Sequence, residues 1–177
     1  MSIPHSVVPP ATELPSDLAG TAARPDLTDD EDVRTLVQRA GQAHTALMQG
    51  DVNGHRSCAP LSEDFVLMSP FGGEPTRPVA LSEERWASIG RFFKNGRHAS
   101  FELIQAYRTA DMVVLAAIER AHVEVGGLAG QDWALRVTLV FRKERGEWML
   151  AHRHADPLAA GIELSEAAAM AGARSRP

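Results

Sequence analysis

The chain has 177 residues, of which 44% are hydrophobic and 23% are charged, a composition typical of one globular domain with a buried core. Its formal net charge of -5, without a long basic stripe, argues against a nucleic-acid partner. Its one cysteine, Cys58, excludes an intrachain disulfide, and no apolar run approaches the ~20 residues that cross a bilayer. We therefore expect a cytoplasmic protein without a signal peptide or a membrane partner.

The chain divides into three parts. Residues 1–27 are rich in proline and show little apolar periodicity, which predicts a flexible leader. Residues 28–157 carry the periodic apolar patterns of a folded domain. Residues 158–177 form a tail, rich in alanine and glutamate as far as Met170, that is either a short helix or a frayed end.

Three helices are predicted from apolar residues at helical spacing. The first begins near Thr28, which starts a capping box, and ends at Gly50. A second, shorter helix covers residues 52–59, and a third covers residues 81–93 with Ser82 as its N-cap.

The strands come mostly after the helices. One short strand is predicted at 65–69, and long alternating or β-branched segments predict four antiparallel strands at 100–108, 112–125, 133–143 and 148–155. This order predicts an α+β fold, in which N-terminal helices pack on one face of a curved antiparallel sheet. The result is a cone with a pocket where helices and sheet diverge.

The last predicted strand carries the densest group of reactive side chains. Alternation places His152, His154 and Asp156 on one face and Arg153 on the other. A two-residue turn at Arg145-Gly146 would direct both histidines to the apolar side, whereas a three-residue loop would direct Arg153 there. We expect the longer loop, because the two-residue turn requires a positive φ at an arginine.

The longer loop gives each face a predicted role. Arg153 then lies on the inner, apolar face with Phe141, Met149 and Ala151. There it binds either a substrate carboxylate or enolate, or a nearby helix carboxylate such as Glu63 or Asp64. The outer face carries the remaining candidates: Glu119, Arg136, Leu150, His152 and His154.

Several alternatives stay open for these candidates. His152 and His154 are interface or sheet hydrogen-bonding groups, or else a general base or ligand donor inside the cone; a metal site on the pair is the least favoured. Asp156 caps a turn or acts as an acid or base at the pocket mouth. Glu119 and Arg136 form a buried or interface ion pair, which we favour, or else a catalytic pair. We expect no metal and no cofactor.

Aromatic and apolar side chains supply the predicted pocket wall. Its candidates are Met68, Trp86, Tyr107 and Phe141, which are first of all core residues. His44 lies on the inner face of the first helix, as a core histidine or a pocket residue. Cys58 has no neighbours that would make it a nucleophile.

Four segments of the sequence resemble a known superfamily. They are Asp64 to Gly73, Arg136 to Val140, Gly146 to Trp148, and His152 to Pro157. They are similar to the NTF2-like superfamily, which includes ketosteroid isomerase, scytalone dehydratase and the SnoaL-type polyketide cyclases, and the resemblance spans roughly residues 30–157 in element order. It implies the cone-shaped fold, a mainly apolar cavity and a homodimer formed through the outer sheet face.

The resemblance also implies two classes of function. One is a dehydratase, isomerase or cyclase that acts on a small apolar carbonyl compound by general acid/base catalysis, with His154, His152 or Asp156 as the catalytic group. The other is a non-catalytic ligand-binding or dimerisation module. Steroid isomerisation is poorly supported, because the inward tyrosine and two aspartates of those isomerases have no match around Tyr107.

Overall fold

The computed structural model describes residues 30–78 and 81–172, and these form four helices and five strands. The predicted leader, residues 1–27, lies outside the described residues. The elements in chain order are α1 (Glu31–Met48), α2 (Val52–Cys58), β1 (Leu61–Met68), α3 (Glu83–Phe92), β2 (Phe93–Arg108), β3 (Met112–Val125), β4 (Gln131–Glu144), β5 (Glu147–Pro157) and α4 (Leu164–Gly172).

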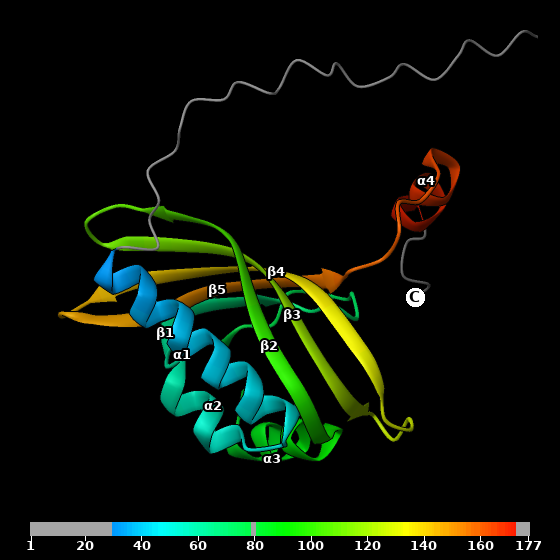
Figure 1. Ribbon diagram of the computed structural model, residues 1–177, viewed down its shortest axis with the longest axis horizontal. Helices are drawn as coiled ribbons and strands as arrows, with labels where there is room; N and C mark the ends of the chain where they lie inside the picture. The colour runs from blue at the N-terminus through cyan, green and yellow to red at the C-terminus, as the bar shows by residue number, and fades with distance from the viewer. Residues whose placement is uncertain (1–29, 79–80, 173–177) are drawn as a thin grey trace, which may run out of the picture.

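The strands form one curved sheet in the order β1-β5-β4-β3-β2 (Figure 1). Strands β2 to β5 are an antiparallel meander, as the sequence predicted. β1 pairs with β5 in parallel, so the sheet is mixed at this edge. The α+β fold is therefore confirmed, with one parallel edge strand added to the expected antiparallel sheet.

Helix α1 begins at an aspartate cap. Asp30 is the N-cap, and its carboxylate accepts a hydrogen bond from the backbone N–H of Val33 at 3.1 Å. Thr28, the predicted start, lies outside the described residues. The helix ends before Gly50, whose φ of +80° and contact with the backbone of Gly90 leave no room for a side chain.

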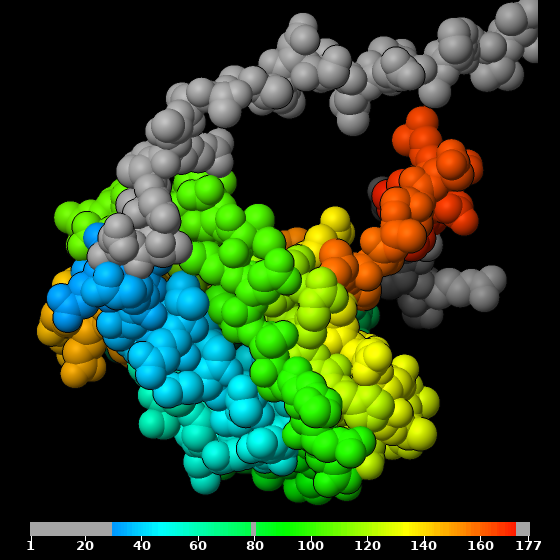
Figure 2. All heavy atoms as spheres, viewed as in Figure 1, coloured from blue at the N-terminus to red at the C-terminus, as the bar shows by residue number. Residues whose placement is uncertain are grey.

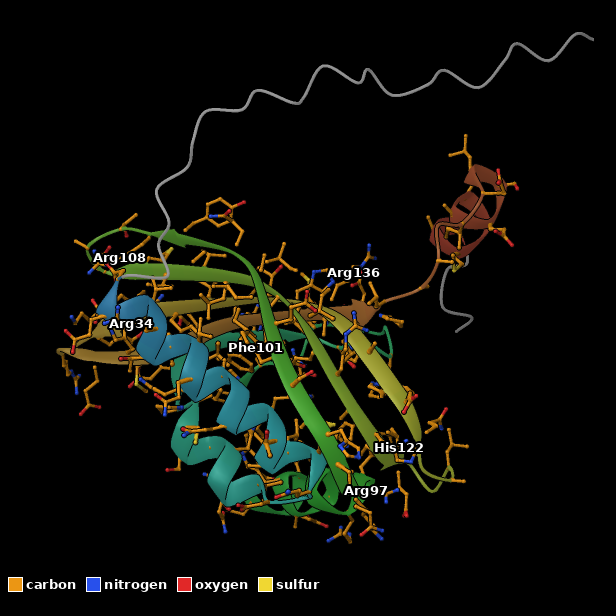
Figure 3. The ribbon with its side chains drawn as sticks, viewed as in Figure 1. Arg34, Arg97, Phe101, Arg108, His122 and Arg136 are labelled. Atoms are coloured by element: carbon orange, nitrogen blue, oxygen red, sulfur yellow. The ribbon has the colours of Figure 1, made fainter. Side chains whose placement is uncertain are left out.

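Helix α1 lies across the concave face of the sheet (Figure 1), and its apolar side is buried. Val33 and Leu36 are fully buried there and join a core with Leu115 and Phe141 from the sheet. Phe101 of β2 packs against this core beside α1 (Figure 3). Burial of these apolar side chains fixes the position of α1 on the sheet. Helices α2 and α3 cover the far end of the concave face (Figure 1).

The third helix has the cap that the sequence predicted. Ser82 accepts a hydrogen bond from the N–H of Arg85 at 3.2 Å, and α3 passes directly into β2 at Phe93. The tail forms α4, which buries no residue and stands away from the sheet (Figures 1 and 2). None of the described helices is long and apolar enough to cross a membrane.

Candidate functional site

The β4–β5 hairpin closes with a two-residue turn, so the predicted three-residue loop is wrong. Glu144 pairs with Glu147, and the two turn residues have positive φ: +52° at Arg145 and +89° at Gly146. These angles are those of a type I′ turn, whose twist matches that of the flanking strands. Matching the twist of two long strands outweighs the local cost of a left-handed arginine.

A β-bulge then reverses the consequence of that turn. Phe141 pairs with Leu150 but Val140 pairs with His152, so Ala151 is the extra residue. Beyond the bulge the side chains change faces, and Arg153 points to the inner face opposite Leu139. Before the bulge, Leu150 is inward and Met149 outward, the reverse of what the sequence predicted.

Arg153 forms a buried ion pair on the inner face of the sheet. Its Nη2 donates to Glu119 Oε2 at 2.7 Å, and the two side chains are 14% and 6% exposed. The predicted ion pair of Glu119 with Arg136 is therefore wrong, because Glu119 faces inward and pairs with Arg153, while Arg136 faces outward. The predicted pairing of Arg153 with a helix carboxylate is wrong for the same reason. Two opposite charges neutralise each other in a place where either one alone would be costly.

His44 of α1 completes this arrangement from the helix side. Its Nδ1 lies 3.5 Å from Glu119 Oε2, and its Nε2 lies 3.0 Å from the carbonyl oxygen of Arg120. A carbonyl oxygen only accepts, so Nε2 carries a proton. His44 therefore ties α1 to β3 directly beside the carboxylate that holds Arg153.

His55 of α2 is a fourth polar group at this place, and it was not among the candidates predicted from the sequence. Its Nδ1 donates to the carbonyl oxygen of Ala43 at 3.0 Å, so that Nε2 is the ring nitrogen left as an acceptor. Burial, followed by the positive charge of Arg153, lowers the pKa of His55 below its ordinary value of 6.5. The imidazole is thus held neutral. We call His44, His55, Glu119 and Arg153 the inner polar cluster.

An interior cavity of about 590 Å³ opens beside this cluster. Its wall is mainly apolar and is supplied by α3, the β1–α3 segment and the concave face of the sheet. The residues that line it include Leu61, Phe65, Leu67, Phe71, Trp86, Ile89, Phe92, Phe93, Trp133, Leu135 and Leu150. The volume lies within the range of small-molecule sites.

The inner polar cluster closes the deep end of this cavity. A void of only about 20 Å³ lies behind it, lined by His44 and Glu119 among others. His55 and Arg153 line both the void and the interior cavity. These two residues are therefore the polar groups at the inner end of the cavity.

One nitrogen of Arg153 has no partner. Its Nη1 is buried and is the one buried side-chain nitrogen or oxygen among the described, non-exposed residues that lacks a hydrogen bond. A buried donor without an acceptor is costly in a finished core. Arg153 lines the interior cavity, so this unpaired donor belongs to a residue of the cavity wall.

The predicted pocket residues divide between the cavity and other places. Arg153 and Trp86 line the interior cavity, and Phe141 lines the small void behind it. Met68 and Tyr107 do not line it: Met68 is 43% and Tyr107 51% exposed. Their strands pair so that these side chains fall on the outer face, Met68 beside His154 and Tyr107 beside Val114.

The three predicted catalytic residues also lie on the outer face. Asp156 accepts two hydrogen bonds from Arg136, which is labelled in Figure 3. This contact raises the pKa of Arg136. His152 bonds through Nδ1 to the carbonyl oxygen of Val66 at 2.8 Å. His154 is exposed and borders a hollow on this face. The turn and the bulge bring Arg153, not these three residues, to the cavity.

Asp64, named as a possible partner of Arg153, has a different one. It accepts two hydrogen bonds from Arg142, which reaches across β5, and one from Ser62. These bonds lower the pKa of Asp64 to about 2. In the described part of the chain, no three His, Cys, Asp or Glu side chains converge as metal ligands.

The sequence matches a known protein family. The sequence model of the SnoaL-like domain matches residues 36–159, which is most of the chain. The chain belongs to the SnoaL-like domain family. The matched part of this SnoaL-like domain runs from α1 to the end of β5 and so contains the inner polar cluster. No curated protein matches the chain.

Solved structures share the fold of this SnoaL-like domain. An NTF2-like protein from Cytophaga hutchinsonii is 18% identical with a TM-score of 0.56, over 73% of this chain and 99% of that one. A candidate ketosteroid isomerase from Shewanella frigidimarina is 21% identical with a TM-score of 0.51, over 69% and 94%. A candidate calcium/calmodulin-dependent protein kinase type II association domain from Thiobacillus denitrificans is 19% identical with a TM-score of 0.52, over 68% and 93%. At these identities the likeness shows the NTF2-like fold and no activity.

Proposed function

We propose that this SnoaL-like domain binds a small, largely apolar carbonyl compound in the interior cavity and transfers a proton next to its carbonyl group. The observation that carries the proposal is Arg153, a cationic side chain that lines an apolar cavity and whose buried Nη1 has no hydrogen-bond partner. A carbonyl oxygen supplies the missing acceptor. Its hydrogen bond becomes stronger as that oxygen gains negative charge in an enolate.

His55 is the general base in this proposal. Its Nε2 is an acceptor, its lowered pKa keeps the ring neutral, and it lines the same end of the cavity as Arg153. Nε2 takes a proton from the carbon beside the carbonyl, and the C–H electron pair moves into the enolate. The negative oxygen then accepts from Arg153 Nη1, and return of the proton at another carbon completes an isomerisation.

Glu119 and His44 are positioning residues in this scheme. Glu119 binds Nη2 at 2.7 Å, which leaves Nη1 without an acceptor, and His44 Nδ1 lies 3.5 Å from the same carboxylate oxygen. His152, His154 and Asp156 receive no part in proton transfer, because none of them lines the interior cavity. The similar fold of the candidate ketosteroid isomerase from Shewanella frigidimarina is compatible with this class of chemistry.

Exchange of hydrogen for deuterium tests the proposal without knowledge of the natural substrate. Phenylacetone and cyclohexanone are incubated with the full chain in D₂O, and loss of the α-proton signal is followed by NMR. We expect exchange above the buffer rate, reduced about 100-fold in His55→Asn and about tenfold in Arg153→Lys. His154→Asn is the matched control and keeps the wild-type rate. Exchange at the buffer rate for both ketones would remove the catalytic claim, whereas binding without exchange would leave a ligand-binding module.

The outer face of the sheet supports a second proposal, a homodimer. Ile104, Tyr107 and Met112 are large apolar side chains left exposed on β2 and β3. A hollow of about 390 Å³ lies among Ile104 and the Arg136–Asp156 pair. Such a mixed apolar and polar surface is typical of an interface between copies of a chain.

A further inference from the structure

Four aromatic side chains that contact one another in series line the outer part of the interior cavity. Phe71 lies 5.6 Å from Phe92 at an interplanar angle of 79° and 5.9 Å from Trp133 at 42°. Phe92 in turn meets Phe93 edge-to-face at 5.1 Å. All four line the cavity and none lines the void behind the inner polar cluster. We call these four residues the aromatic collar.

Phe71 is held at this place although it is 54% exposed. The loop that carries it is closed at its base by two backbone hydrogen bonds between Leu67 and Thr76, of 2.8 and 2.9 Å. Its tip turns through Gly72 and Gly73, whose φ values are +72° and +86°. The backbone N–H of Phe71 also donates to Ser69 Oγ at 3.2 Å. A defined turn therefore fixes the position of the Phe71 ring, although much of its apolar surface remains exposed to water.

The ring contacts within the collar are edge-to-face or tilted, so no two of these rings stack face to face. A flat ring that enters between them gains stacked and edge-on contacts that a saturated ring of the same size does not make. Exposed Glu74 and Arg85 border the same cavity, and their opposite charges sum to zero at this end. Selection at the outer end therefore rests on shape and aromatic character.

We propose that the ligand is an aryl-substituted carbonyl compound, with its flat ring in the aromatic collar and its oxygen on Arg153 Nη1. This inference rests on the proposed function and adds the chemical class of the substrate. The aromatic collar and Arg153 line the same cavity, whose wall is mainly apolar. A short saturated link between ring and carbonyl group fits that wall.

Calorimetric titration with two carboxylic acids tests the class. 2-Naphthylacetate and decahydro-2-naphthylacetate carry the same carboxylate, which stands for the enolate oxygen, on an aromatic or a saturated two-ring body. We expect the full chain to bind the aromatic acid about fivefold more tightly. Phe71→Leu brings that ratio to about one, whereas Tyr107→Leu, which removes an equally exposed ring outside the cavity, preserves it.

The outcomes separate the two proposals. Equal binding of the two acids, tighter binding of the saturated acid, or an unchanged ratio in Phe71→Leu overturns the aromatic class. If both acids then still bind more weakly to Arg153→Lys, the proposed function stands and only the class fails. If neither acid binds, or if Arg153→Lys binds both as the wild type does, both proposals fail.

Discussion

Arg153 and Glu119 form a buried pair of opposite charges, and this pairing leaves Nη1 of the guanidinium group without a hydrogen-bond partner. Removal of one member of such a pair leaves the other charged and buried. We expect Arg153→Met to lower the free energy of unfolding by about 3 kcal/mol in denaturant titrations. Arg136→Gln, which breaks the exposed pair with Asp156, costs much less, because water and salt screen that pair.

The double variant Arg153→Met/Glu119→Leu shows how much of the lost unfolding free energy comes from the unpaired charge and how much from altered packing. Because it removes both charges, it recovers much of the stability that Arg153→Met loses. Equal losses in Arg153→Met and Arg136→Gln would contradict a buried pair at Arg153.

His55 makes stability depend on pH in a definite direction. Burial lowers its pKa, so below 6.5 the unfolded chain takes up a proton at His55 that the folded chain does not. Stability contributed by the neutral ring is present above pH 6.5 and declines as the pH falls from there toward the lowered pKa. Denaturant titrations from pH 7 to 5 measure this slope, which is at most about 1.4 kcal/mol per pH unit for one proton.

His55→Asn isolates that contribution, because an amide keeps a donor for the carbonyl oxygen of Ala43 and does not titrate. We expect a flatter slope in His55→Asn and an unchanged slope in the exposed His154→Asn. An identical slope in His55→Asn and the wild type would show that the folded state does not hold His55 neutral.

Among the elements, the β4–β5 hairpin determines what the site contains. Its turn keeps Arg145 at a φ of +52°, where asparagine is far less strained than arginine. We expect Arg145→Asn to raise the free energy of unfolding by about 0.5 kcal/mol. Arg145→Ala removes the same exposed side chain without a preference for this backbone shape and brings no gain. A loss of stability in Arg145→Asn would contradict the type I′ turn.

The sequence was sufficient for the order of the elements but not for the register of this hairpin. Apolar periodicity predicted the three main helices and the four-stranded meander, because each pattern follows from which side of an element is buried. The strain of a positive φ at Arg145 favours a longer loop, whereas the twist of the two long strands favours the two-residue turn that forms. The bulge at Ala151 has no sequence signal, since alanine fits either face.

The inward direction of Arg153 was predicted, but from a turn that does not exist. The turn and the bulge each shift the alternation by one residue, so the two errors cancelled at Arg153 and not at Leu150. His55 was missed because the reactive side chains of the last strand gave the stronger signal. A weaker signal was present: Val52, His55 and Ala59 share one face of the predicted second helix at spacings of three and four. Parallel pairing of β1 with β5 depends on long-range packing that the local sequence does not encode.

At the scale of the whole molecule, the sheet separates two surfaces with different roles. Its concave face encloses the interior cavity, and its outer face presents the exposed apolar side chains of the proposed homodimer. Light scattering of the full chain tests the homodimer, and we expect a dimer that Ile104→Lys converts to a monomer. Leu128→Lys is the matched control, because Leu128 is also 59% exposed but lies in the β3–β4 connection. A monomeric wild type, or dissociation by both substitutions alike, would contradict an interface on the outer face.

The central claim is that Arg153 Nη1 receives the ligand's oxygen at the inner end of the interior cavity. A crystal structure of the full chain with 2-naphthylacetate tests it most directly, because it locates that oxygen relative to the nitrogen. We predict a carboxylate oxygen about 2.7–3.1 Å from Nη1, the usual range for a charge-assisted hydrogen bond, with Nη2 still on Glu119. A carboxylate bound on the outer face beside His152 and His154, or one inside the cavity but out of reach of Arg153, would contradict it.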